Sequence, residues 1–311
     1  MEHVVITGAD GFIGSNLTRY FVKNNFFVYA VVSPESKTTD RISNIRNVRV
    51  IVNDLKNAEQ IAGQIDAVPI ALIHLAWAGV SPEERRATDV QVQNITLALQ
   101  SVKLAHLIHA QRFIFPGSTM EYSYCGGLIN ESAKPSPQNA YGAAKISARY
   151  LCESLCKELR VPYVYIVITG IYGSDRYDNN VITYTIRSLL AGEKPRYTKL
   201  EQMWDYIHID DLVEAILQIA QKGRAGAFYS IGHGDNWPLY KYVNIIHNLI
   251  DPSLPLGIGE IPYTDERMPS SCMDLTALIK DTGFCPKIPF DKGIQQVILK
   301  IKEELYSSEE K

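Results

Sequence analysis

The chain has 311 residues, of which 46% are hydrophobic and 21% charged, as in a globular protein of one large domain or of a large and a small one. The formal net charge is −3 and no stretch is strongly basic, which argues against a nucleic-acid surface because such a surface must neutralise phosphates. The apolar runs are too short to span a membrane, so we expect neither a nucleic-acid nor a membrane partner.

Strand patterns and helix patterns alternate along the first part of the chain. Strands are predicted at His3–Thr7, Phe27–Val32, Val48–Val52, Ala67–Ala76, Arg112–Phe115 and Tyr163–Ile168, and helices at Gly14–Lys23, Ala87–Ala110 and Ala140–Leu159. The strands are apolar throughout rather than alternating, as expected when helices cover both faces of a sheet. The pattern therefore predicts an α/β fold of the Rossmann type, with a doubly wound and mainly parallel sheet.

The regular alternation ends after Gly173. Helices are predicted at Val181–Leu190 and Leu212–Lys222, and a strand that can return to the main sheet at Phe228–Ile231. The region Asp251–Pro289 is rich in proline and has little periodicity, and the polar tail from Tyr306 is expected to fray. We expect one domain over residues 1–175 and a smaller portion over residues 176–311, packed on the sheet.

The start of the chain and its cysteines indicate the compartment. The first strand pattern begins at His3, which leaves no room for a signal peptide, so a cytoplasmic protein is expected. The five cysteines are odd in number and scattered, which argues against a disulfide framework. Cys152 and Cys156 lie four residues apart, but no nearby Cys or His completes a set of metal ligands. We expect thiols and no metal site.

A glycine-rich turn follows the first strand and opens the first helix. Glycines allow a tight turn and a close backbone approach, and a helix N-terminus offers N–H groups to a pyrophosphate. The expected dinucleotide-binding residues of this turn are Gly8, Gly11, Phe12, Ile13 and Gly14. Residues 1–175 are therefore expected to bind the dinucleotide, and residues 176–311 the substrate.

The end of the second strand distinguishes NAD from NADP. An acidic residue there bonds the ribose 2′-hydroxyl, whereas its absence leaves room for a 2′-phosphate. This strand ends at Val32-Ser33 without an acid, and Ser33, Lys37 or Arg41 can bind a phosphate. The alternatives are a solvated loop, or a Glu35 that turns inward. NADP is favoured, and NAD stays open.

Asp54 and Leu55 follow the third strand. An Asp at this place can accept a hydrogen bond from an adenine amino group, and a helix N-cap is the alternative role for the same residue. Both roles stay open, and Asp54 and Leu55 are expected at the cofactor.

A phenol and an ammonium lie one helical turn apart, at Tyr141 and Lys145. A nearby ammonium lowers the pKa of a tyrosine toward the working pH, as a general acid or base at a carbonyl or carbinol oxygen requires. Ser118 follows the strand Arg112–Phe115, at the sheet edge where ligands bind, and its hydroxyl can donate to the same substrate oxygen. The expected catalytic set is Ser118, Tyr141 and Lys145.

Together these motifs resemble the extended short-chain dehydrogenase/reductases, in the epimerase/dehydratase group that acts on nucleotide sugars. The resemblance rests on TGADGFIG at the start, Asp54-Leu55, Ile73–Ala76, Gly117–Tyr122, YGAAK at Tyr141–Lys145, and Trp204–Asp211. It implies that Leu75 and Ala76 line the cofactor, that Tyr141 and Lys145 also contact it, and that Lys145 holds the nicotinamide ribose. It also implies a homodimer built through the helices Ala87–Ala110 and Ala140–Leu159.

Departures from the resembling members narrow the reaction. Members that are 4,6-dehydratases carry an Asp-Glu pair directly after the catalytic hydroxyl, where this chain has Thr119 and Met120, and Glu121 is one residue out of step. Members that are 4-epimerases hold NAD tightly and usually end the second strand with Asp. Members that are 4-ketoreductases use NADPH and need only the Ser, Tyr and Lys set.

The resemblance therefore implies an NADPH-dependent reduction of the 4-keto group of a nucleotide-linked 4-keto-6-deoxyhexose, with the proton from Tyr141. A 4-epimerase with tightly bound NAD is the alternative. A non-catalytic dinucleotide-sensing protein is a further alternative, although such proteins tend to lose the Tyr or the Lys that this chain keeps.

The resemblance also indicates residues that contact the substrate. Ser118 and Thr119 are expected at the sugar, and Asn180 and Val181 at the nucleotide diphosphate, with a helix N-cap as the alternative for Asn180. Arg267 matches a late arginine that pairs with the diphosphate, and a surface ion pair is its alternative role.

Overall fold

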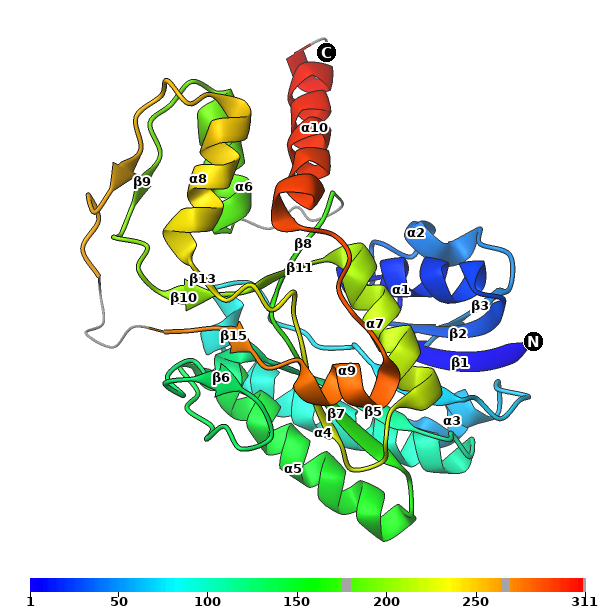
Figure 1. Cartoon of the computed structure of the whole chain (residues 1–311). Coiled ribbons are helices and arrows are strands. Elements are labelled where there is room, and N and C mark those ends of the chain that lie inside the picture. The colour runs from blue at the N-terminus through cyan, green and yellow to red at the C-terminus, as the bar shows by residue number, and fades with distance from the viewer. Residues whose placement is uncertain (175–179, 264–268, 310–311) are drawn as a thin grey trace.

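The computed structural model describes residues 1–174, 180–263 and 269–309, and within them seven strands form one parallel sheet. The order across the sheet is β12-β7-β5-β4-β1-β2-β3 (Figure 1). These strands are β1 (Glu2–Thr7), β2 (Phe26–Val32), β3 (Val48–Val52), β4 (Ala71–His74), β5 (Phe113–Ser118), β7 (Tyr163–Ile168) and β12 (Phe228–Ile231).

Helices cover both faces of this sheet, and successive strand residues alternate between the two cores. In β1, Val4 and Ile6 pack into one core while Val5 packs into the other, because neighbouring side chains of a strand point to opposite faces. The first core is covered by α1 (Phe12–Lys23), α2 (Asp40–Ser43), α7 (Ile209–Lys222) and α9 (Thr276–Thr282), and the second by α3 (Ala58–Ala62), α4 (Thr88–Leu107) and α5 (Ala140–Leu159) (Figure 1). The predicted doubly wound parallel fold is confirmed.

A further apolar cluster lies beyond the carboxyl edge of the sheet, where α6 (Val181–Leu190), α8 (Leu239–Ile250) and α10 (Phe290–Glu309) stand together (Figure 1). Short strands link this cluster to the sheet: β6 (Leu128–Ile129), β8 (Gly170–Tyr172), β9 (Arg196–Tyr197), β10 (Met203–Trp204), β11 (Tyr206–His208), β13 (Trp237–Pro238), β14 (Gly257–Ile258) and β15 (Cys272–Met273). Two 3-10 helices, η1 (Glu84–Arg86) and η2 (Thr119–Glu121), follow the ends of β4 and β5.

The later half of the chain differs most from the sequence prediction. The helix α10 continues to Glu309, and Ile294, Val297 and Ile301 anchor its earlier part in the apolar cluster, so the expected fraying from Tyr306 stays a prediction. The region Asp251–Pro289 contains α9, which the periodicity does not reveal. The strand Phe228–Ile231 does lie in the main sheet, paired with β7.

The division near residue 175 stays a proposal, since residues 175–179 lie outside the described part. Within the described part, no helix combines the length and the apolar character needed to cross a membrane.

Candidate active site

The glycine turn between β1 and α1 packs backbone against backbone. Gly8 has a φ of +64°, and a Cβ there would lie 2.8 Å from the backbone nitrogen of Ala76. A Cβ at Gly14 would lie 2.1 Å from the carbonyl oxygen of Gly8, which no side chain allows. Within the described residues, the N-cap Gly11 provides no side-chain hydrogen bond, and the first turn of α1 carries no acid. This helix start therefore suits a pyrophosphate, and the turn fits a dinucleotide.

The end of β4 lies against this turn. Thr7 accepts the N–H of Leu75 on its carbonyl oxygen at 3.1 Å, and its hydroxyl accepts the N–H of Ala76 at 3.3 Å. The same hydroxyl is 3.0 Å from Nδ1 of His74, whose pKa falls to about 3 because the ring is fully buried and faces the charge of Lys145. Leu75 and Ala76 thus lie beside the glycine turn, and their expected contact with a cofactor stays a prediction.

A buried carboxylate ties the glycine turn to the loop after β2. Asp10 accepts hydrogen bonds from the hydroxyls of Ser36, Thr38 and Thr39, and only 6% of the residue is exposed. Ser33 is exposed at the end of β2, where its hydroxyl accepts the N–H of Glu35 at 3.2 Å. Sequence reasoning missed Asp10, although its place inside the glycine motif is a visible signal.

Asp54 does not cap a helix, so that alternative is wrong. Asn57 caps α3 instead, by accepting the N–H of Gln60. Asp54 is exposed and pairs with Lys56 at 2.8 Å, and the hydrogen bonds from Lys56 lower the pKa of its carboxyl. Leu55 is buried with a φ of +62°, and its N–H donates to the side chain of Asn53. The adenine contact predicted for Asp54 stays a prediction.

Ser118, Tyr141 and Lys145 come together at the carboxyl edge of the sheet. Ser118 ends β5, and its side chain interacts with the phenol of Tyr141, in the first turn of α5, so that the pKa of this phenol is lowered. The approach depends on Gly142, because a Cβ there would lie 2.4 Å from the carbonyl oxygen of Met120. The Lys145 ammonium donates to the carbonyl oxygen of Pro116 at 3.0 Å.

The electrostatics of this set differ from the sequence prediction. Burial raises the pKa of Tyr141 to about 12, against lowering by the Ser118 hydrogen bond and by the charge of Arg85. The expected lowering by Lys145 is therefore wrong, since its ammonium lies 3.7 Å from the ring centre of Trp77 and 6.0 Å from that of Tyr141. Burial also lowers the pKa of Lys145, to about 7, against the opposing charge of Glu121.

Three further side chains surround the set. Trp77 packs edge-on to Tyr141 at 6.2 Å between ring centres, and its indole N–H donates to Gln91. The guanidinium carbon of Arg85, in η1, lies 5.7 Å from the ring centre of Tyr141. Glu121 is fully buried and accepts the N–H of Ser118 at 2.6 Å. Only Glu121 has a sequence signal that could have found it, because Ser118 and Glu121 form an S-x-x-E capping box.

The structure tests only part of what was predicted for the substrate residues. Asn180 caps α6 by accepting the N–H groups of Ile182 and Thr183, so the capping role is confirmed, and the diphosphate contact of Asn180 and Val181 stays a prediction. Thr119 follows Ser118 and is 9% exposed. Arg267 lies outside the described residues.

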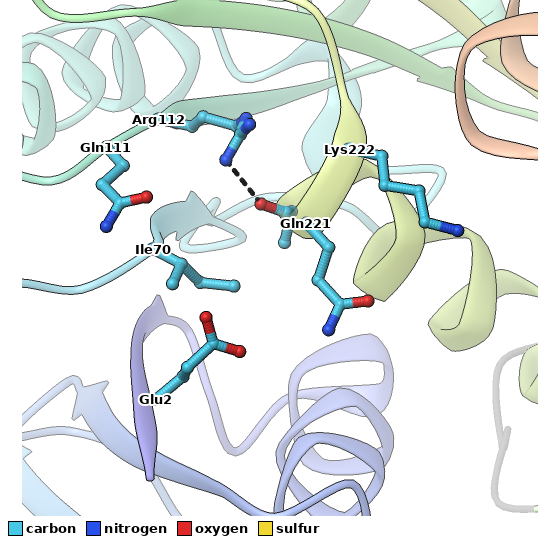
Figure 2. A pocket seen from close by; sticks show the side chains of 7 residues that line it. Glu2, Ile70, Gln111, Arg112, Gln221 and Lys222 are labelled. Carbon is cyan, nitrogen blue, oxygen red and sulfur yellow. Dashed lines mark hydrogen bonds between the residues drawn. The ribbon is translucent and has the colours of Figure 1, made fainter.

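Two hollows in the described surface lie away from the candidate site. One, of about 330 Å³, is at the amino edge of the sheet, where Arg112 donates to the carbonyl oxygen of Ala220 at 2.9 Å (Figure 2). Of its lining residues, Glu2 begins β1 and Ile70 directly precedes β4, whereas Ser118 lies at the opposite end of a strand. The other, of about 410 Å³, lies beside β12 and α9. No cluster of His, Cys, Asp or Glu in the described residues is suited to a metal ion.

Comparisons with known proteins identify the family. The family model of the "NAD dependent epimerase/dehydratase family" matches residues 4–232. The chain belongs to this family. The family resemblance drawn from the sequence is thereby confirmed.

Individual relatives are distant but cover the whole chain. The dTDP-D-glucose 4,6-dehydratase of Bos taurus is 24% identical over 98% of this chain and 90% of its own length. The UDP-glucose 4-epimerase of Thermotoga maritima has a TM-score of 0.84 at 22% identity, and the match covers 97% of this chain and 99% of that one. The dTDP-glucose 4,6-dehydratase of Bacillus anthracis, in complex with NAD, has a TM-score of 0.83 at 19% identity and covers 97% of both chains. At sequence identities of 22% and 19%, these two structural matches show the fold alone.

The glycine turn predicts a specific loss of dinucleotide binding. Gly14→Ala places a methyl group 2.1 Å from the Gly8 carbonyl, so the turn must open. We expect NADH and NADPH to bind at least about ten-fold more weakly, and the protein to lose about 1–3 kcal/mol of stability. Fluorescence titration and thermal melting measure the two effects. Gly127→Ala is the control, since a Cβ there meets no described atom within 4 Å. Wild-type binding by the Gly14 variant would contradict this site.

Proposed function

We propose that the protein transfers a hydride from NADPH to the 4-keto group of a nucleotide-linked 4-keto-6-deoxyhexose. The observation that carries this proposal is that the side chains of Ser118 and Tyr141 interact beside the buried Lys145, with Thr119 and Met120 in the two positions after Ser118. Ser118 supplies a hydrogen-bond donor and Tyr141 a proton donor, as reduction of a ketone needs. Thr119 and Met120 offer no carboxylate that could assist elimination of water.

Each residue has a definite task in this reaction. Bound reduced nicotinamide supplies the hydride that the carbonyl carbon receives. The Ser118 hydroxyl donates a hydrogen bond to the carbonyl oxygen, and the Tyr141 phenol gives that oxygen its proton, so the product is a secondary alcohol. With a pKa of about 12, Tyr141 is protonated at neutral pH, as a proton donor must be. The Arg85 guanidinium, 5.7 Å from the Tyr141 ring centre, lowers the pKa of this phenol and so stabilises the phenolate that remains.

Water elimination fits this site less well. A dehydratase needs an acid and a base that reach the sugar carbons next to the keto group. Thr119 and Met120 cannot serve as this pair, and the Glu121 carboxylate is occupied by the Ser118 N–H and the Tyr165 phenol. The relative from Bos taurus is called a 4,6-dehydratase, but its likeness of 24% does not carry that activity to this chain.

Epimerisation at C4 is the second candidate, because the same Ser118, Tyr141 and Lys145 can oxidise a carbinol and reduce the ketone again. The fold likeness to the UDP-glucose 4-epimerase of Thermotoga maritima favours this candidate. An epimerase retains NAD between turnovers, whereas a reductase exchanges its cofactor. The cofactor that co-purifies therefore separates the two.

The decisive experiment has two steps. The purified protein is denatured and its supernatant analysed for dinucleotide, and then the native protein is offered a panel of nucleotide-linked 4-ketosugars with NADPH and with NADH. The proposal expects little bound cofactor and oxidation of NADPH, followed by the loss of the near-ultraviolet absorbance of the reduced nicotinamide. Stoichiometric bound NAD, with interconversion of unoxidised nucleotide sugars, would identify an epimerase.

Removing the phenol tests whether the chain is a catalyst or a dinucleotide sensor. We expect Tyr141→Phe to lower kcat of ketosugar reduction roughly 10²–10⁴-fold, with KM little changed, because the proton donor is lost. Steady-state kinetics measure both constants. Tyr240→Phe is the control, since Tyr240 is 43% exposed on α8. Wild-type activity in the Tyr141 variant would show that another group donates the proton, and absence of any reduction by the wild type would favour the sensor.

The preference for NADPH is proposed from the end of β2, where Ser33 is exposed and no acid follows Val32. The double variant Lys37→Ala/Arg41→Ala is expected to raise KM for NADPH about ten-fold and to leave KM for NADH unchanged, because only NADPH carries the 2′-phosphate. Kinetics with both cofactors measure the ratio, and Lys23→Ala is a control for loss of a surface charge. Equal changes for NADH and NADPH would argue against this phosphate site.

A homodimer through α4 and α5 also belongs to the proposal. These helices pack side by side, and they expose the apolar side chains Val92, Leu107, Tyr150 and Leu151. We expect Leu151→Glu to convert the dimer to a monomer, because a charge in an apolar interface is not solvated. Light scattering after size exclusion measures the mass. Leu299→Glu is the control, since Leu299 is 61% exposed on α10. A monomeric wild type would refute the dimer.

A further inference from the structure

A fully buried carboxyl lies directly beneath the catalytic hydroxyl. Glu121 is 0% exposed, and its Oε1 accepts the backbone N–H of Ser118 at 2.6 Å. Its Oε2 accepts the phenol O–H of Tyr165, from strand β7. The Ser118 hydroxyl in turn accepts the N–H of Met120 at 3.2 Å. The carboxylate therefore fixes the backbone from which the Ser118 side chain projects.

The sequence makes room for this arrangement at Gly117. A Cβ at this position would lie 2.0 Å from the Tyr165 phenol oxygen and 2.5 Å from Oε1 of Glu121. Any larger residue would displace one of the two groups. The bonds between Ser118, Glu121 and Tyr165 thus depend on a glycine one residue before the catalytic hydroxyl.

The charges of two cations from α5 act on the Glu121 carboxyl. Lys145 and Arg149 lie one helical turn apart, and both lower the pKa of Glu121 against the larger effect of burial, which raises it to about 7. Arg149 donates to the Tyr122 phenol at 2.6 Å, and its guanidinium carbon lies 4.4 Å from the ring centre of Tyr165. The charge of Glu121 in turn raises the pKa of Lys145, which burial lowers.

The other titratable groups around Lys145 carry no charge at neutral pH. His74, on β4, is neutral because its pKa is about 3. Tyr141 keeps its proton because its pKa is about 12, and burial also raises the pKa of the Cys152 thiol on α5. Glu121 is therefore the group of opposite charge that the described structure provides for the buried ammonium.

We propose that Glu121 is a positioning residue of the catalytic set, which fixes Ser118 through its backbone and holds the proton on Lys145. This inference rests on the proposed function, because Ser118, Tyr141 and Lys145 are the set that it serves. Glu121 itself faces the protein interior and does not contact the substrate.

The proposal predicts the direction in which the pH profile of reduction shifts when the charge of Glu121 is removed. Glu121→Gln keeps an oxygen for the Ser118 N–H but removes the charge. The pKa of Lys145 then falls, because the charge that raises it is gone, and the pKa of Tyr141 falls for the same reason. Reduction needs both groups protonated, so the alkaline limb of kcat/KM moves to lower pH, by about one unit. A purely structural role would lower activity at every pH without moving the limb.

The experiment measures kcat and KM for ketosugar reduction by NADPH across pH in four proteins. Wild type and Glu158→Gln, an exposed position on α5, are expected to share one profile. Glu121→Gln is expected to lower kcat while both KM values stay within about two-fold, and to shift the limb. Tyr165→Phe removes a hydrogen-bond donor that lowers the pKa of Glu121, so Glu121 carries less charge in this variant. The alkaline limb is therefore expected to move in the same direction as in Glu121→Gln, but by less. This variant replaces Glu121→Gln in the test if Glu121→Gln does not fold.

A readout without substrate separates this inference from the proposed function. The Lys145 ammonium lies 3.7 Å from the ring centre of Trp77, so its titration changes Trp77 fluorescence. In a Trp204→Phe/Trp237→Phe background, the midpoint is expected to fall in Glu121→Gln and in Tyr165→Phe. If wild type reduces no ketosugar, the proposed reaction fails while a shifted midpoint still supports the charge coupling. An unchanged midpoint with an unchanged pH limb overturns the role of Glu121.

Discussion

Lys145 carries a positive charge into the protein between β5 and the loop after β4, with 5% of the residue exposed. An ammonium taken out of water is unfavourable unless it finds partners that replace its hydration. Here the Pro116 carbonyl accepts a hydrogen bond, the Trp77 ring offers its face, and Glu121 supplies an opposite charge. These partners come from different elements, so the buried Lys145 ammonium is stabilised only when the sheet, the loop after β4 and α5 are assembled.

Glycines set how closely those elements approach. The glycine at 14 lets the start of α1 meet the Gly8 carbonyl, Gly117 leaves space for the Glu121 and Tyr165 oxygens, and Gly142 lets α5 begin against Met120. In each case a single methyl group would force the backbones or the polar side chains apart. Glycines that allow close packing thus position both α1, which suits a pyrophosphate, and α5, which carries Tyr141. These two helices lie on opposite faces of one sheet.

The sequence predicted the parts of the structure that depend on local patterns. The bounds of β3, β7, α5 and α6 agree with the prediction because apolar runs and helical spacing mark them. Tyr141, Lys145 and Ser118 were found because spacing along a helix and a place at a strand end are visible in a sequence. Trp77 and Arg85 were missed, since their approach to Tyr141 arises from the folding of the β4 loop and η1 over α5. The sign of the Tyr141 pKa shift was also wrong, because spacing predicts proximity to Lys145 but not the depth of burial.

Burial of the phenol bears on the direction of the chemistry. A tyrosine whose pKa is about 12 holds its proton at neutral pH, whereas oxidation of a carbinol needs the phenolate as a base. The opposing effects on Tyr141 have different origins: Glu121 acts from the protein interior and raises its pKa, and Arg85 acts from the face of the ring and lowers it. An enzyme that must run both directions needs a phenol whose two states are close in free energy. The balance in this structure favours the protonated phenol.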